Sequence, residues 1–372
     1  MIRRPPRSTR KESSAASDVY KRQQMVICNH GKFQALTFET PFNFRKNSST
    51  SNGNNTLTSI SNRIMWFKFF ILSGGLIEMS KPKVAWIRSA VLDFWSDSAE
   101  MSLTTDSIDL VDHDLEVHMV SSEGEVIEAV RDADLVLDEM VPLGKSVIQH
   151  MNKAQAIISL GHGFNHIEDQ AATDMGIMVA NCAGFCSDEV ANHTIMFLLA
   201  CSKRLIQLDK LVKNGEWTST TIKSLFPMPA VYGQTLGLVG FGNIGRHVSR
   251  KAKAFGINVK VYDPYLEPWV AQEYEIQRVE SLESLGAESD YVSMHVPLNS
   301  ETKGLADASL FKSMKPTAYF INTCRGPTQN ESDLISALNN KEIAGAALDV
   351  FEIEPTPESN PLLLMDNVIA SP

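Results

Sequence analysis

Cysteine is scarce in this 372-residue sequence, and the few cysteines form no recognisable pattern. They are an odd number at irregular spacing: Cys28, Cys182, Cys186, Cys201 and Cys324. Such spacing argues against a disulfide framework and favours thiols in a reducing, cytoplasmic compartment. Cys182 and Cys186 could supply half of a metal site, but no second Cys pair or His pair at suitable spacing completes it. We therefore expect no structural metal.

Positive charge is scarce outside the N-terminal segment. The whole chain has 34 Lys/Arg and 44 Asp/Glu, of which residues 1–78 hold 12 and 4. Positions 79–372 therefore hold 22 basic and 40 acidic residues, a net charge of −18. Nucleic-acid binding draws its affinity mainly from phosphate neutralisation, so this acidic body argues against it. The apolar run at residues 64–77 contains Lys68 and is shorter than the roughly 20 residues that span a bilayer. We expect no membrane role.

The first 78 residues differ in composition from the rest. Residues 1–24 are rich in Arg and Ser, and residues 47–62 form a polar Asn/Ser/Thr tract that cannot bury enough surface to order itself. The segment resembles a mitochondrial transit peptide and, more closely, a translated sequencing adapter at residues 2–11. We expect residues 1–78 to be a non-native or disordered leader and Met79 to be the native start.

From Lys83 onward, β-prone runs alternate with helical stretches, which is the rhythm of parallel βα units. In the first half the expected strands are residues 84–87, 115–120, 135–137, 156–160 and 177–180, with helices at 98–109 and 167–175. In the second half we expect a long helix at 187–205, an irregular segment at 213–232, strands at 257–262, 291–295, 318–322, 345–349 and 367–370, and a helix at 331–340. The pattern predicts an α/β protein with two domains, residues 79–182 and 183–372.

The most informative stretch begins at Thr235, where an apolar run turns at a glycine motif and continues into helix-forming residues. Gly240 permits the tight turn, Gly242 lets the backbone approach a pyrophosphate, and Gly245 lets the helix pack on the strand. Asn243 and Ile244 open that helix, whose N–H groups favour phosphate. Asp263 lies 18 residues past Gly245, near the expected distance of about 20.

A carboxylate at Asp263 would accept from both ribose hydroxyls and repel a 2′-phosphate. We therefore predict NAD as the cofactor rather than NADP. The alternative is that Asp263 only caps the turn before Pro264.

Four further segments follow expected strands: residues 295–299, 322–326, 348–355 and 367–372. Strand ends form the edge at which open α/β sheets bind ligands. Together with the glycine motif, these segments resemble the D-isomer-specific 2-hydroxyacid dehydrogenases over residues 83–372. The resemblance implies two doubly wound parallel-sheet domains, a flavodoxin-like substrate domain and a Rossmann NAD-binding domain. It also implies a homodimer formed through the NAD-binding domain.

The resemblance also assigns site residues. Arg325 is the catalytic cation that holds the substrate carboxylate, a task that suits a permanently charged, forked guanidinium. Glu354 is the catalytic carboxylate that orients an acid/base histidine. The alternatives are an arginine that only closes a turn and a solvated glutamate before a proline. The substrate-binding residues are Gly161, His162 and Gly163, and the further cofactor-binding residues are His295, Pro297, Thr323, Cys324 and Asp349.

In the family the acid/base histidine comes directly after the segment that ends here at Pro372, so we expect the chain to be truncated at its C-terminus. The leading hypothesis is an NAD-dependent oxidoreductase acting on a small D-2-hydroxy or 2-keto acid of the phosphoglycerate, glycerate or glyoxylate type. The alternative is an NAD-sensing binding protein related to the family's corepressors.

Overall fold

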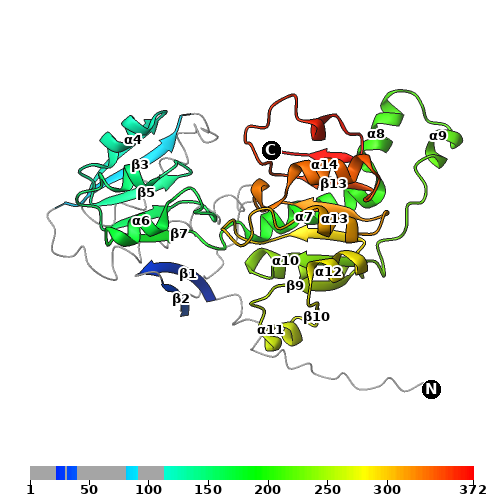
Figure 1. The fold of residues 1–372 in the computed structure, drawn as a ribbon, viewed down its shortest axis with the longest axis horizontal. Helices are drawn as coiled ribbons and strands as arrows, with labels where there is room; N and C mark the ends of the chain where they lie inside the picture. The colour runs from blue at the N-terminus through cyan, green and yellow to red at the C-terminus, as the bar shows by residue number, and fades with distance from the viewer. Residues whose placement is uncertain (1–21, 30–31, 40–80, 91–112) are drawn as a thin grey trace, which may run out of the picture. The chain divides into compact units, whose positions relative to one another are not determined.

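The computed structural model describes residues 22–29, 32–39, 81–90 and 113–372. The chain divides into two compact units, Met1–Phe185 and Cys186–Pro372, each built on a sheet with helices (Figure 1). The observed division comes three residues after the expected one at residue 182. The predicted α/β class with two parallel-sheet domains is confirmed.

The first unit has the strand order β2-β1-β7-β6-β5-β3-β4. Its strands are β1 (Arg22–Asn29), β2 (Lys32–Glu39), β3 (Lys83–Ser89), β4 (Asp114–Val120), β5 (Leu135–Glu139), β6 (Ala156–Ser159) and β7 (Met178–Asn181). The five strands from β3 to β7 are parallel, and their order is that of flavodoxin-like folds. The predicted flavodoxin-like topology is therefore present.

The expected leader is described only at β1 and β2. These strands pair with each other in antiparallel fashion, and β1 also pairs with β7 at Cys28 and Val179. The rest of residues 1–78, including the apolar run at 64–77, lies outside the described residues, as does the expected helix at 98–109. The proposal that the leader is non-native stays a prediction.

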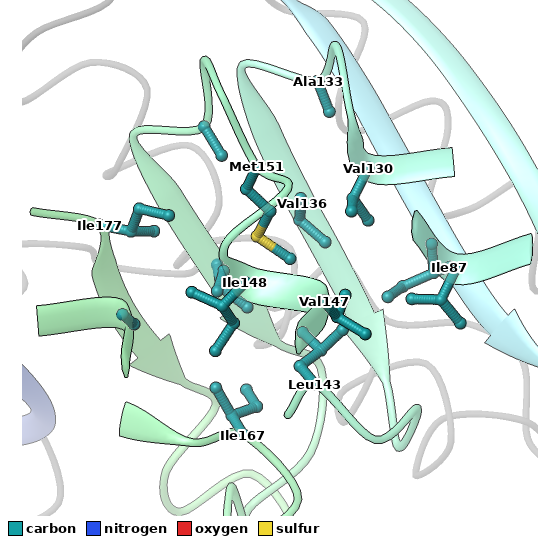
Figure 2. Close-up of a cluster of buried hydrophobic side chains, with 14 of the residues drawn as sticks. Ile87, Val130, Ala133, Val136, Leu143, Val147, Ile148, Met151, Ile167 and Ile177 are labelled. Carbon is teal, nitrogen blue, oxygen red and sulfur yellow. The ribbon is translucent and has the colours of Figure 1, made fainter. Parts of the chain in front are cut away.

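Short helices connect the strands of the first unit: α4 (Glu123–Val130), α5 (Lys145–Ile148) and α6 (Asp169–Asp174). Figure 2 shows the apolar cluster in which Val147, Ile148 and Met151, on α5 and just after it, lie against the sheet. Leu143, which begins the α5 connection, pairs with Ile167 in a parallel bridge, and both are buried. The segments that follow β5 and β6 are therefore fixed side by side.

The second unit has the all-parallel order β10-β9-β8-β11-β12-β13-β14. Its strands are β8 (Thr235–Val239), β9 (Asn258–Tyr262), β10 (Gln277–Arg278), β11 (Tyr291–Met294), β12 (Tyr319–Asn322), β13 (Gly345–Leu348) and β14 (Val368–Ala370). This is the 3-2-1-4-5-6 order of the Rossmann fold with one more strand. The order reverses between β8 and β11, and ligands bind at such a reversal.

Helices cover the second sheet (Figure 1). They are α7 (Ser187–Lys203), α8 (Leu205–Lys213), α9 (Ser219–Lys223), α10 (Asn243–Ala254), α11 (Pro268–Glu273), α12 (Leu282–Glu288), α13 (Ala308–Ser313) and α14 (Glu331–Asn339), with 3-10 turns η2 (Gly326–Thr328) and η3 (Pro361–Leu364).

Two details of the predicted helices were wrong. The long helix ends at Lys203, because Arg204 adopts a left-handed conformation with φ 46°, and α8 starts afresh at Leu205. The segment expected to be irregular contains α9, whose first turn is closed by a capping box between Thr218 and Thr221. A threonine in both positions of the box gives a weaker sequence pattern than the usual Ser/Thr and Glu pair.

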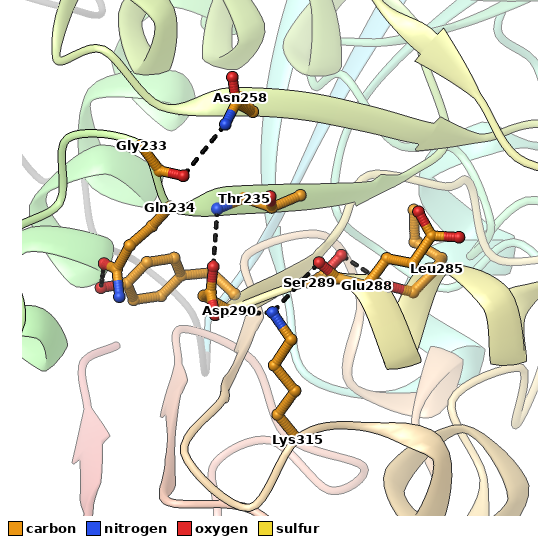
Figure 3. A network of polar contacts seen from close by, with 10 residues as sticks. Gly233, Gln234, Thr235, Asn258, Leu285, Glu288, Ser289, Asp290 and Lys315 are labelled. Atoms are coloured by element: carbon orange, nitrogen blue, oxygen red, sulfur yellow. Dashed lines mark hydrogen bonds and ion pairs between the residues drawn. The ribbon is translucent and has the colours of Figure 1, made fainter.

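A polar network closes the amino edge of the second sheet, opposite the edge where ligands bind (Figure 3). The Asp290 carboxylate accepts from the Thr235 N–H at 2.8 Å and from Lys315 Nζ at 2.8 Å. The Asn258 amide donates to the Gly233 carbonyl at 3.0 Å. These contacts join the starts of β8, β9 and β11, so this edge holds the strands in register.

Candidate active site

The turn after β8 is shaped for close approach by a ligand. Gly240 has φ +92°, and a Cβ there would lie 2.6 Å from the His295 carbonyl oxygen. A Cβ on Gly245 would lie 2.7 Å from the Gly240 carbonyl oxygen, so glycine lets α10 pack against the turn. A Cβ on Gly242 would meet no atom of the described chain within 4 Å. The turn has the geometry that the predicted roles of the three glycines require.

The N-terminus of α10 opens onto the same turn. Gly242 is the N-cap, and no side chain hydrogen-bonds to the first turn of the helix at this position. The N–H groups at Asn243 and Ile244 are those that a helix leaves without an intrahelical partner, and they attract anions. The half-buried Ile244 side chain packs against the core of the unit and fixes the start of the helix. This arrangement fits the pyrophosphate of a dinucleotide.

Asp263 follows β9 and joins two loops. One carboxylate oxygen accepts from the Phe241 N–H in the glycine turn at 2.8 Å, and the other accepts from the Tyr265 N–H at 2.9 Å. The alternative that Asp263 only caps the turn before Pro264 therefore explains the contact to Tyr265 but not the contact to Phe241. A carboxylate has about four acceptor positions, so two hydrogen bonds leave capacity for ribose hydroxyls.

His295 follows β11, across the strand-order reversal from Gly240. Its Nε2 lies 2.9 Å from Ser293 Oγ, and its Nδ1 is buried without a hydrogen-bond partner among the described residues. Burial lowers the pKa of His295 to about 3, so the ring is neutral at pH 7. A neutral ring with an unsatisfied buried nitrogen fits a polar ligand group. Pro297, two residues further on, is exposed.

Arg325 lies in a turn that the buried Asn322 organises. The Asn322 amide donates to the Arg325 carbonyl at 3.2 Å, and its oxygen accepts from the Cys324 N–H at 3.0 Å. Arg325 Nη1 donates to the Cys324 carbonyl at 2.7 Å. The turn-closing alternative accounts for this Nη1 contact. Sequence reasoning quoted Asn322 in the motif but gave it no task.

Thr323 and Cys324 line the same turn. Thr323 Oγ1 lies 3.0 Å from Thr194 Oγ1 on α7, a contact that the sequence did not indicate. Cys324 Sγ donates to the Asn322 side-chain oxygen at 3.1 Å, and burial raises the pKa of the thiol. Cys324 is therefore a neutral thiol that packs the turn, since a nucleophilic cysteine needs a lowered pKa.

The Arg325 and Glu354 turns lie against each other. A Cβ on Gly326 would lie 1.7 Å from the Phe351 carbonyl oxygen, so only glycine permits this approach. The exposed Glu354 accepts from the Phe351 N–H at 2.9 Å and so closes its own turn. This contact gives Glu354 a structural task, and its catalytic role stays a prediction.

Asp349 belongs to a three-residue contact that sequence reasoning missed. Its Oδ1 accepts from Ser371 Oγ at 2.8 Å and lies 3.1 Å from His193 Nε2. His193 Nε2 is also 2.8 Å from Ser371 Oγ, and its ring stands edge-on to Phe197 with centroids 4.5 Å apart. His193 comes from α7 and Ser371 from the end of β14, so no local spacing connects them. The contact fixes the Asp349 carboxylate at the carboxyl edge of the sheet.

The predicted substrate loop, residues 161–163, lies in the first unit after β6. All three of its carbonyl oxygens accept hydrogen bonds from that unit: Gly161 from the Cys182 N–H at 3.0 Å, His162 from the Asn181 amide at 2.6 Å and Gly163 from Ser159 Oγ at 3.1 Å. The His162 ring accepts from the Gly184 N–H at 3.2 Å. The acceptors of the loop are thus used within the fold.

In the described part of the chain, no group of three or more His, Cys, Asp or Glu side chains could hold a metal ion. None of the described helices is both long and apolar enough to cross a membrane.

Known proteins resemble this chain in sequence. Residues 195–372 match the family described as D-isomer specific 2-hydroxyacid dehydrogenase, NAD binding domain. A glyoxylate reductase of Korarchaeum cryptofilum is 36% identical over 248 residues, which cover 66% of this chain and 74% of the relative. The chain belongs to the D-isomer specific 2-hydroxyacid dehydrogenase family. The predicted resemblance and NAD-binding domain are confirmed.

Other proteins that resemble this chain differ in the substrates that their names give. A D-3-phosphoglycerate dehydrogenase of Methanocaldococcus jannaschii is 36% identical over 273 residues. The matched residues make up 73% of this chain, which spans only 51% of the length of that relative. The solved structure of an acyclic imino acid reductase with NADPH and D-Arg is 26% identical, with a TM-score of 0.68 over 79% of this chain and 89% of that one. None of these names supports the corepressor-like alternative.

Proposed function

We propose that this protein is an NAD-dependent oxidoreductase that interconverts a small D-2-hydroxy acid and its 2-keto acid. The observation that carries the proposal is the Arg325 turn. Asn322 fixes this turn two strands from the glycine turn of β8, at the same carboxyl edge of one sheet. An open parallel sheet binds its ligands at this edge.

Arg325 holds the carboxylate of the substrate through paired N–H donors and withdraws electron density from the neighbouring carbonyl. The tether from Nη1 to the Cys324 carbonyl restricts the guanidinium, so little side-chain entropy is lost on binding. The loop at residues 161–163 supplies backbone N–H groups to the substrate, while its carbonyl oxygens stay bound within the first unit.

The cofactor site uses Gly240, Gly242, Gly245, Asp263 and His295. The glycine turn and the start of α10 hold the pyrophosphate, and Asp263 accepts from the ribose hydroxyls. Asp349, held by His193 and Ser371, serves the nicotinamide end. When bound, the nicotinamide supplies or accepts the hydride. Glu354 orients the acid/base histidine.

We also propose a cytoplasmic homodimer that pairs through the second unit. Its segment from α8 to the start of β8 exposes large apolar side chains, among them Leu205, Val212, Trp217 and Phe226, and Trp217 is 73% exposed. Exposed apolar groups in such number are typical of a surface that another protein covers. Cys182, Cys186, Cys201 and Cys324 are free thiols, which suits a reducing compartment. Sedimentation should give a dimer, and Trp217→Lys should shift it toward monomer.

The decisive experiment measures NADH binding by fluorescence and, in a protein that carries the acid/base histidine expected after Pro372, NADH oxidation with a panel of 2-keto acids. Turnover of at least one 2-keto acid, lost in Arg325→Lys with NADH binding retained, supports the proposal. NADH binding without turnover of any acid in the panel contradicts it.

A further inference from the structure

One turn of α7 contacts the ends of three strands of the second sheet. Thr194 Oγ1 lies 3.0 Å from Thr323 Oγ1 in the turn after β12. On the same turn of the helix, His193 Nε2 lies 3.1 Å from Asp349 Oδ1 after β13 and 2.8 Å from Ser371 Oγ after β14. Two neighbouring residues of one helix therefore reach the carboxyl ends of β12, β13 and β14.

Backbone hydrogen bonds join these strand ends to one another. The Asp349 N–H donates to the Asn322 carbonyl at 3.0 Å, and the Ser371 N–H donates to the Leu348 carbonyl at 3.0 Å. Asn322 is the buried residue that organises the Arg325 turn. The backbone therefore fixes the position of Asp349 beside that turn, and the direction of its carboxylate depends on side-chain contacts.

The side-chain hydrogen bonds determine which groups donate. The Ser371 hydroxyl has a single hydrogen, which it donates to Asp349 Oδ1 at 2.8 Å. His193 Nε2 lies 2.8 Å from the same hydroxyl oxygen, so Nε2 must carry a hydrogen and donate it. Asp349 Oδ1 is thereby occupied, while Oδ2 accepts no hydrogen bond from the described residues. His193 and Ser371 thus engage one oxygen of Asp349 and leave the other for a ligand.

The His193 ring is itself held in place. It stands edge-on to the buried Phe197, one turn further along α7, with centroids 4.5 Å apart and an interplanar angle of 72°. The His193 and Asp349 side chains are 31% and 27% exposed, so a ligand at this edge can reach them. A carboxylate that is already oriented loses little conformational freedom when a ligand binds to it.

Asp349 lies on the side of the sheet where the nicotinamide half of a dinucleotide belongs. The glycine turn after β8 and Asp263 after β9 form the site proposed for the pyrophosphate and the adenosine ribose. A dinucleotide crosses the reversal of strand order, so its other half belongs to the side of β11, β12 and β13. Arg325 and Asp349 follow the last two of these strands. A carboxylate oxygen there can accept from the amide group of nicotinamide.

We infer that His193 is a positioning residue of the cofactor site. Together with Ser371 it directs Asp349 so that Oδ2 accepts a hydrogen bond from the nicotinamide amide. It also fixes Ser371, two positions before the expected acid/base histidine. The inference rests on the proposed function and adds to it a helix residue that acts through Asp349 and Ser371. It predicts that binding at the nicotinamide end and order at the end of β14 depend on each other.

The first test compares the dissociation constants of NADH and ADP-ribose, because ADP-ribose lacks the nicotinamide ring. In calorimetric titrations of the full chain, the wild type should bind NADH about tenfold more tightly than ADP-ribose, and His193→Asn should lose most of this difference. The shorter Asn side chain cannot place its amide where Nε2 lies. His193→Gln can place an N–H group there, and it should restore NADH affinity to within about threefold of the wild type.

The matched control is Asn192→Ala, at the exposed neighbouring position of α7, which should change neither dissociation constant. Ser371→Ala breaks the same contact without altering α7 and should also lose NADH affinity selectively, whereas Ser371→Thr keeps the hydroxyl and should not. An equal loss of both ligands in His193→Asn and Ser371→Ala, or no loss of either, overturns the inference and leaves the proposed function standing. A wild type that binds neither ligand overturns both.

The second test follows amide hydrogen exchange in residues 367–372. The Ser371 N–H is bonded to the Leu348 carbonyl, so its exchange rate reports how firmly the end of β14 is held. In the wild type, saturating NADH should slow exchange in this segment severalfold more than saturating ADP-ribose does, and the difference should disappear in His193→Asn. Equal slowing by the two ligands in the wild type, or a difference that persists in His193→Asn, overturns the inference.

Discussion

The carboxyl edge of the second sheet presents glycines and backbone N–H groups, whereas the same edge of the first sheet presents paired charged side chains. In the second unit, Gly240 and Gly245 bring backbone atoms together and Gly242 leaves space. In the first unit, Asp138 with His166 and Arg88 with Glu139 shape the edge. Backbone recognition suits a ligand shared by many proteins, and side-chain recognition suits a ligand that varies. The comparison therefore predicts that single changes abolish cofactor binding but retune substrate choice.

Arg325 is the exception at the second edge, since it acts through its side chain, and it should give the largest effect. Arg325→Lys keeps the charge but cannot fork onto a carboxylate. Loss of charge-assisted, paired hydrogen bonds of about 1.5–3 kcal/mol each should lower kcat/KM by roughly 100-fold to 1000-fold. Steady-state kinetics with the preferred 2-keto acid measures this. NADH affinity should stay within about twofold, and a parallel loss of NADH binding would show damage to the turn instead.

Gly242→Ala tests the backbone edge directly. The added methyl group meets no described atom within 4 Å, so the melting temperature should not change. The same methyl group occupies the space proposed for the pyrophosphate, and we expect NADH affinity to fall about 30-fold, or about 2 kcal/mol. Calorimetric titration measures the NADH affinity. The control is Gly124→Ala on α4 of the first unit, where an added Cβ also meets no described atom within 4 Å. Unchanged NADH affinity in Gly242→Ala would contradict the assigned site.

The difference between the edges also explains what could be predicted from the sequence. The glycine turn, the strands on either side of it and the Arg325 motif are local patterns, and each was found from residues close together in the chain. The contact of His193 with Ser371 joins positions 178 residues apart, and that of Asp138 with His166 joins positions 28 apart. Such pairs form only when the sheet brings strand ends together, so no local spacing indicates them.

The break after Lys203 was missed for a related reason. Arg204 has no propensity for a left-handed conformation, yet it adopts φ 46° where α7 gives way to α8. Tertiary packing of α7 against the sheet decides the end of the helix, and helix propensity is a weak guide in that setting.

Asp263→Asn should have a smaller effect on the cofactor edge. The change removes the charge that opposes a 2′-phosphate and keeps one acceptor oxygen, which can retain one of the two contacts to the Phe241 and Tyr265 N–H groups. We expect the ratio of NADPH to NADH dissociation constants to fall about tenfold, or about 1.4 kcal/mol. Fluorescence titration with both dinucleotides measures the ratio. The control is Asp366→Asn, which removes the charge of an exposed carboxylate that pairs with Lys210. This control should leave the ratio of the two dissociation constants unchanged. A wild-type protein that prefers NADPH would refute the assignment of Asp263.

The smallest expected effect is on the free energy of unfolding of the protein, not on its affinity for the cofactor. Burial lowers the pKa of His295 from 6.5 to about 3, so the unfolded chain binds a proton that the folded chain does not over this range. The folded state therefore loses stability as pH falls from 6.5 toward 3, by up to about 1.4 kcal/mol per pH unit. His295→Asn cannot bind this proton. Its stability relative to the wild type should rise by about 1 kcal/mol between pH 6.5 and 5.5.

Urea denaturation of the NADH-free protein at both pH values measures this change. His150→Asn, at an exposed histidine of the first unit, is the control and should show no such difference. An equal pH response of the two variants would mean that His295 titrates normally, and the neutral ring assigned to the cofactor edge would then be wrong. A difference confined to His295→Asn would instead show that the half-buried His295 ring stays uncharged at this edge. The edge would then differ from that of the first unit both in its backbone-built turn and in the absence of charge on this ring.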